Sequence, residues 1–177
     1  MEITTEYLIS RNICPQGLDR FVNHTETDAI KMIDILISEK NYQWANWLLS
    51  RFFNNDERIK YAIFSAELVI DLFESEFPDD EKPRNAINSA KAYLEKHDEI
   101  SKNDASAFIS DVLSSSSKPD SASSAYSAGA TAGSDEASSP AHCVSSAVFA
   151  TSASVSSNDA WITILNYGIK IFNEREN

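Results

Sequence analysis

The chain has little of what several classes of protein require. Only four glycines and five prolines occur among its 177 residues, fewer than is usual for a loop-rich or β-sandwich protein. No apolar run approaches the ~20 residues that cross a membrane. The first ten residues lack the basic and apolar stretches of a signal peptide. These absences favour a soluble, cytoplasmic and helical protein.

Basic residues are also scarce, since 15 lysines and arginines face 27 aspartates and glutamates. The formal net charge is −12 and the isoelectric point is about 4.6. Direct binding to nucleic acid needs clustered Lys and Arg for the phosphates. We therefore expect neither direct nucleic-acid binding nor membrane binding, and a protein partner of basic character.

Metal, cofactor and catalytic motifs are missing from the sequence. Cys14 and Cys143 lie far apart, and neighbouring helical residues such as His142 and Cys143 point about 100° apart, which makes a poor chelate. Adjacent Asp79 and Asp80 lack the spaced oxygen ligands of a calcium loop. No GxSxG, GxGxxG or GxxxxGK[ST] motif occurs. We expect a protein without catalytic residues, cofactor or metal.

Residues 1–100 follow the pattern of amphipathic helices, with apolar side chains three and four positions apart. The expected N-caps are Thr25 or Thr27 for one helix and Asn41 for the next. Trp44 and Trp47 share a helical face, which predicts core packing, with an aromatic anchor for a partner as the alternative.

The widest apolar face belongs to a helix expected from Asp56 to Pro78. Pro83 can open the following helix, and residues 100–103 are expected to form a connector. The apolar stripe of the first of these helices consists of Ile59, Ile63, Ala66, Ile70 and Phe73.

The composition changes between residues 114 and 160, where 17 serines and 11 alanines fill most of 47 positions. Such a tract is often a flexible linker. Here Pro119 and Pro140 are placed to open helices, and Tyr126 is a single bulky residue among small ones. An apolar helix that starts near Trp161 must also bury its surface. Val144, Val148 and Val155 keep to one helical face, so closely packed helices are favoured over a linker.

These patterns predict an all-α fold, a multi-helix bundle in a single domain over 1–177. Its first part, 1–100, would hold amphipathic helices. Its second part, 101–177, would hold closely packed Ser/Ala-rich helices and the apolar C-terminal helix.

Several segments carry a family resemblance. The sharpest reads Phe77-Pro78-Asp79-Asp80-Glu81-Lys82-Pro83-Arg84-Asn85-Ala86-Ile87, and others are Cys14-Pro15-Gln16-Gly17-Leu18, Trp47-Leu48-Leu49-Ser50-Arg51, Arg58 to Glu67 and Asp71-Leu72-Phe73-Glu74. Together they resemble a bacterial family of immunity proteins of the Imm-5-like kind. That family has Ala-dominated helices after the motif, whereas this chain has many serines there, and Lys82 where arginine is expected. The resemblance implies an all-α cytosolic protein associated with toxin systems, with no catalytic residues assigned.

The candidate binding site is a cluster of carboxylates followed by one arginine. The segment from Asp71 to Glu81 contains no basic residue. It is either a solvated helix end, with Asp79 and Asp80 capping the next helix, or a surface that steers a basic partner. Arg84 is expected to clamp Asp79 or Asp80. The candidate residues are Asp71, Glu74, Glu76, Asp79, Asp80, Glu81 and Arg84.

The leading functional hypothesis is an immunity-type protein that neutralises a basic toxin or nuclease by direct contact through this acidic surface. The alternative is an acidic inhibitor of phage type, which imitates nucleic acid to block a host nuclease or defence complex. An enzyme assembled from scattered residues is a third hypothesis. Helix faces made of small residues also leave a homo-oligomer open.

Overall fold

The computed structural model describes residues 2–113, 119–133, 139–151 and 157–175, and the statements below concern these ranges. The all-α fold is confirmed, and the part described contains one isolated β-bridge, between Glu2 and Asp28, besides its helices. The helices are α1 Thr5–Ser10, α2 Pro15–Val22, α3 Ala29–Ser38, α4 Tyr42–Phe52, α5 Asn55–Glu67, α6 Ile70–Glu76, α7 Lys82–Lys96, α8 Glu99–Ser106, α9 Ile109–Leu113, α10 Asp120–Gly133, α11 Ser139–Thr151 and α12 Ser157–Glu174.

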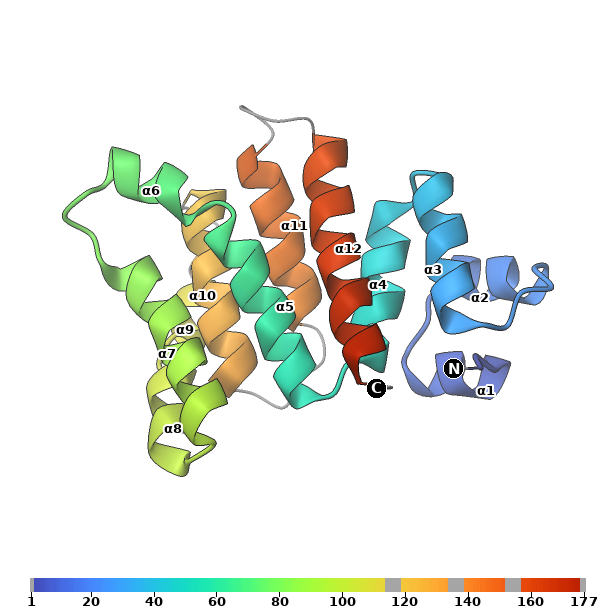
Figure 1. Ribbon diagram of the computed structural model, residues 1–177, viewed down its shortest axis with the longest axis horizontal. Coiled ribbons are helices and arrows are strands. Elements are labelled where there is room, and N and C mark those ends of the chain that lie inside the picture. Colours follow the sequence, from blue (N-terminus) through green and yellow to red (C-terminus); the bar gives the residue numbers. More distant parts are fainter. Residues whose placement is uncertain (1, 114–118, 134–138, 152–156, 176–177) are drawn as a thin grey trace.

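The helices are arranged along one long axis (Figure 1). Helices α1 and α2 lie at one end, and α6, α7 and α8 lie at the other. The C-terminal helix α12 lies between α4 and α11 and contacts both of them, as well as α5. The N-terminal helices and the α6–α7 region therefore occupy opposite ends of the molecule.

Two of the expected helix caps differ in the structure. Asp28, and neither Thr25 nor Thr27, caps α3, because its Oδ1 accepts from the backbone nitrogens of both Ile30 and Lys31 at 3.1 Å. Asn41 does occupy the N-cap position of α4. Its side chain makes no cap bond, since its amide donates to Glu39 instead.

The helix expected from Asp56 to Pro78 is two helices in the structure. Helix α5 ends at Glu67 and α6 begins at Ile70, because the backbone at Val69 leaves the helical region and Val69 becomes fully buried. The predicted apolar stripe is nevertheless confirmed as buried core in both helices.

The connector expected at residues 100–103 lies inside helix α8. Asp98 begins this helix by accepting from the backbone nitrogen of Ser101 at 2.7 Å. Ser101 and Ala105 are buried, and α8 packs against α7 and α10. A polar sequence therefore forms a helix because its small residues fit between two neighbours.

The Ser/Ala-rich tract forms helices α10 and α11, as the sequence predicts, and Pro119 and Pro140 lie at their starts. Helix α10 is buried from Ser121 to Thr131 and contacts α5, α7, α8, α9 and α11. Ser127 donates to the carbonyl of Ser123 at 2.9 Å, so its hydroxyl costs little to bury. Residues 114–118, 134–138 and 152–156 of the tract, Val155 among them, lie outside the described residues.

Two clusters of buried side chains meet at α5. Tyr61 belongs to the cluster built mainly from α3, α4 and α12, whereas Ile59 and Ile63 belong to the cluster around α7 and α10. The Tyr61 hydroxyl donates to Asn46 at 3.0 Å inside the first cluster. Tyr126, the expected bulky residue among small ones, is 2% exposed and stacks against Phe108 in the second.

Gly168 marks the closest approach of α12 to the core. A Cβ atom at this position would lie 2.6 Å from Leu49 Cδ2 and 2.7 Å from Tyr61 Cε2. We expect Gly168→Ala to lower the free energy of unfolding by about 1–3 kcal/mol, because overpacking outweighs the gain in helix propensity. Urea denaturation measures this loss. Exposed Asn166→Ala on the same helix is the control, and a more stable Gly168→Ala variant would contradict the packing.

Cys143 is fully buried against α5, with its Sγ 3.1 Å from the carbonyl oxygen of Ala62. Burial raises the pKa of this thiol to about 12. Cys14 is exposed. We expect a thiol reagent at about pH 8 to label one thiol per native chain and two in urea, because only the thiolate reacts. Cys14→Ser should abolish the native labelling, whereas labelling of both native thiols would contradict the buried site.

Candidate functional site

The acidic segment forms the corner between α6 and α7 at one end of the molecule (Figure 1). Helix α6 ends at Glu76, and the Phe77 backbone nitrogen still donates to the carbonyl of Phe73 at 2.8 Å. Asp80 Oδ1 then accepts from the backbone nitrogen of Lys82 at 3.0 Å where α7 begins. Pro83 occupies the first turn of α7, as the sequence predicts.

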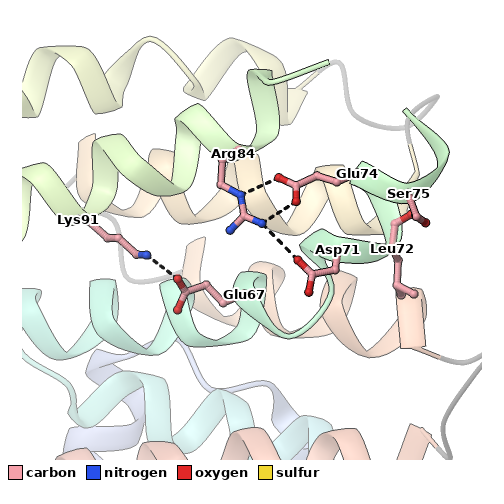
Figure 2. Close-up of polar contacts among 7 residues, drawn as sticks. All are labelled: Glu67, Asp71, Leu72, Glu74, Ser75, Arg84 and Lys91. Carbon is pink, nitrogen blue, oxygen red and sulfur yellow. Dashed lines mark hydrogen bonds and ion pairs between the residues drawn. The ribbon is translucent and has the colours of Figure 1, made fainter. Parts of the chain in front are cut away.

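Arg84 pairs with α6 instead of the loop, which corrects the expected contact with Asp79 or Asp80. Its Nε lies 2.6 Å from Glu74 Oε1, and its Nη2 lies 2.7 Å from Glu74 Oε2 and 3.3 Å from Asp71 Oδ1 (Figure 2). Asp71 and Glu74 are three residues apart on one helix and so share a face. Glu74 alone offers the planar guanidinium two acceptor oxygens, and Asp71 adds a third.

This ion pair shifts the titration of both partners. The hydrogen bond from Arg84 lowers the pKa of Glu74 below its usual value, and the same bond raises the pKa of Arg84. Both side chains are about one-third exposed, at 37% and 33%. The contact therefore fixes the geometry of α6 against α7 more than it stabilises the fold.

The other four candidate carboxylates have no basic partner in the part of the chain that the structure describes. Within the described ranges, no ion pair involves Glu76, Asp79, Asp80 or Glu81, and all four are exposed. We call these four residues the acidic corner. The structure thus separates the candidates into a paired set, Asp71, Glu74 and Arg84, and an unpaired set that faces solvent.

Large apolar side chains are exposed beside the acidic corner. Leu68, Leu72 and Phe77 are 42%, 41% and 40% exposed. Figure 2 shows Leu72 pointing away from the Arg84 ion pair. An open concavity of about 540 Å³ at the α6–α7 corner is lined by other residues, namely Glu74, Pro78, Asp80, Glu81, Arg84, Asn85 and Asn88. Exposed apolar and exposed charged side chains therefore both occur on α6 and on the residues next to it, and protein interfaces use both kinds of group.

Sequence reasoning missed these apolar residues as part of the site. Leu68 and Leu72 lie beside the predicted stripe, and a single long helix would bury them with it. The break at Val69 turns α6 and leaves both side chains at the surface. The α5–α6 break is the feature that creates the mixed surface, and no glycine or proline marks it in the sequence.

The two tryptophans also differ from the expectation of simple core packing. Trp44 is 36% exposed and Trp47 is half-buried, and both line an apolar cavity between α1, α2, α3 and α4. The ring of Trp44 lies under the guanidinium of Arg20, and the ring of Trp47 lies under that of Arg51. This cavity lies at the end of the molecule opposite the acidic corner.

Across the described ranges, no three His, Cys, Asp or Glu side chains come together as a metal ion would require. None of the helices described there combines the length and apolar character of a membrane span. The fold and site define an all-α protein with a mixed acidic and apolar corner. Comparison with family models, curated proteins and solved structures finds no match, so the resemblance to immunity proteins stays a prediction from the motif.

The paired set gives a pH-dependent contribution to stability. Because the folded-state pKa of Glu74 is depressed, its ion pair stabilises the fold above the usual value of 4.5 and is lost as the pH falls through the folded value. We expect Glu74→Gln to lower the free energy of unfolding by less than about 1 kcal/mol at neutral pH. This difference should vanish in acid.

Urea denaturation across the acid range measures the effect. Glu76→Gln is the matched control, since Glu76 lies on the same helix without a basic partner in the described ranges. A loss for Glu74→Gln that stays constant with pH would contradict the ion pair.

Proposed function

We propose that this protein is a non-enzymatic, immunity-type protein that neutralises a basic toxin or effector by direct contact through its acidic corner. The observation that supports this proposal is the surface at the α6–α7 corner. Four carboxylates that have no basic partner among the described residues lie there, and three large apolar side chains, Leu68, Leu72 and Phe77, are exposed on α6 or next to it.

The two kinds of group serve different steps of binding. Unpaired carboxylates raise the encounter rate with a positively charged surface over several ångströms. Exposed Leu and Phe side chains then supply the apolar area that holds a complex together once water is excluded. A toxin that acts on nucleic acid carries the complementary positive surface, because it must hold phosphates.

The paired set positions this surface. Arg84 joins the start of α7 to α6 through Glu74 and Asp71, which fixes the loop between the two helices. A fixed loop loses little conformational freedom on binding. In addition, the single positive charge of Arg84 offsets part of the repulsion within a segment that holds six carboxylates.

Charge reversal at the corner tests the proposal. We expect the triple variant Glu76→Lys, Asp79→Lys and Asp80→Lys to lose protection against a basic toxin that the unmodified protein neutralises, and to slow association with that toxin at least about tenfold. Cell survival and surface plasmon resonance measure the two effects.

The control triple variant is Asp34→Lys, Glu95→Lys and Asp104→Lys, which changes the net charge equally at exposed sites outside the corner. Thermal unfolding checks that both variants are folded. Equal protection and equal association rates for the two variants would refute a binding role for the corner.

A competition experiment separates the proposal from the nucleic-acid mimic. If apolar side chains hold the complex with the toxin together, we expect the complex to stay intact when a DNA or RNA duplex is added in excess. We also expect Phe77→Ala to weaken binding to the toxin. If the duplex displaces the protein and Phe77→Ala has no effect on binding, the protein acts instead by imitating the negative charge of nucleic acid.

A further inference from the structure

A second site lies at the other end of the molecule, in the apolar cavity between α1 and α4. The cavity has a volume of about 300 Å³ and is partly open to solvent, the size and form of a pocket for a small molecule. Its walls are largely aromatic and aliphatic, and they include Leu8, Phe21, Met32, Leu36, Trp44 and Trp47.

Two arginines cover the two tryptophans of this cavity. The guanidinium of Arg20 lies 5.5 Å from the ring centre of Trp44, and that of Arg51 lies 5.1 Å from the ring centre of Trp47. Arg20 also lines the cavity itself, and its Nη2 pairs with Glu39. Guanidinium groups stacked on indole rings are held in place before any ligand enters.

Both arginines keep an unused hydrogen-bond donor. Among the described residues, the Nε atoms of Arg20 and Arg51 are the buried side-chain nitrogens or oxygens that have no hydrogen-bond partner. Buried donors are nearly always paired in folded proteins, so an unpaired one calls for an acceptor. Arg20 lines the cavity and Arg51 does not, so Arg20 is the one of these two arginines whose guanidinium a ligand in the cavity can meet.

The surroundings of Arg51 are positive, although the whole chain carries a net charge of −12. No carboxylate pairs with Arg51 in the described part of the chain, and its pKa is lowered first by burial and then by Arg11. The Arg11 guanidinium lies 5.3 Å from the ring centre of Tyr7, whose hydroxyl donates to the Arg51 carbonyl oxygen. The one acid paired at this cavity, Glu39, is balanced by Arg20.

We propose that this cavity binds a small aromatic carboxylic acid. The aromatic ring of the ligand packs between the tryptophan and phenylalanine side chains, and its carboxylate accepts from Arg20 within the positive field of Arg51. The largely apolar walls disfavour sugars and polyphosphates, which need many polar partners, and the arginines repel cations. The inference does not depend on the proposed function, because the two sites share no residue.

Three ligands that share one ring system test, on the unmodified protein, whether binding requires a negative charge on the ligand. The probes are 3-phenylpropionate, its neutral amide and the corresponding amine, measured by isothermal titration calorimetry. We expect the carboxylate to bind at least about tenfold more tightly than the amide, since charged hydrogen bonds add that much. The amine should bind most weakly. Equal binding of carboxylate and amide, or no binding of either, would overturn the proposal.

Variants and spectroscopy locate the ligand. Arg20→Gln should remove the preference for the carboxylate, Arg20→Lys should keep part of it, and Lys96→Gln on α7 is the control that removes one distant positive charge. In NMR spectra, the indole N–H signals of Trp44 and Trp47 should shift on binding, whereas that of Trp161, outside the cavity, should not. A preference for the carboxylate that survives in Arg20→Gln, or shifts confined to Trp161, would refute the site.

Discussion

The close approach of α10 to its neighbours is the constraint on which the rest of the structure depends. A Cβ atom on Gly133 would lie 2.5 Å from the backbone of Ser106, and one on Gly129 would lie 3.2 Å from the Ala86 carbonyl oxygen. Only very small side chains permit such spacing. Because α10 also contacts α5, α6 and α7, its position decides where α7 begins relative to α6. The Arg84 ion pair, and with it the acidic corner, follows from that placement.

Charge is distributed unevenly along the long axis of the molecule. Carboxylates that have no basic partner among the described residues lie at the α6–α7 end, whereas Arg11 and Arg51 lie near the cavity at the α1–α4 end. Helix α5 joins the two halves, since Ile59 and Tyr61 belong to different core clusters. A strongly acidic composition therefore coexists with a local group of arginines, Arg11 and Arg51, near the cavity. Net charge alone describes neither site.

The sequence was sufficient for the fold class, for most helices and for the helical order of the described Ser/Ala-rich segments, because the spacing of apolar residues along a helix is a local property. It was insufficient where tertiary packing decides. The break at Val69 follows from burial of that side chain, and α8 forms because its small residues fit against α10. The predicted contact of Arg84 with Asp79 or Asp80 was wrong, because spacing along the chain does not reveal which face of α6 meets α7. The cavity at Trp44 requires four helices to meet, which no local pattern shows.

The serine hydroxyls of the buried helices lead to a consequence for how such a sequence evolves. Ser127 and Thr131 each donate to a carbonyl one turn earlier in the same helix, so they need no partner on a neighbouring element. Serine at such a position occupies almost the volume of alanine, and the acceptor for its hydroxyl is a backbone carbonyl of the same helix. Exchange between the two residues leaves helix spacing unchanged. Mutational drift can therefore exchange serine and alanine at such positions while the helices keep their separation, whereas Ser124, which donates to the Cys143 carbonyl of α11, depends on its neighbour.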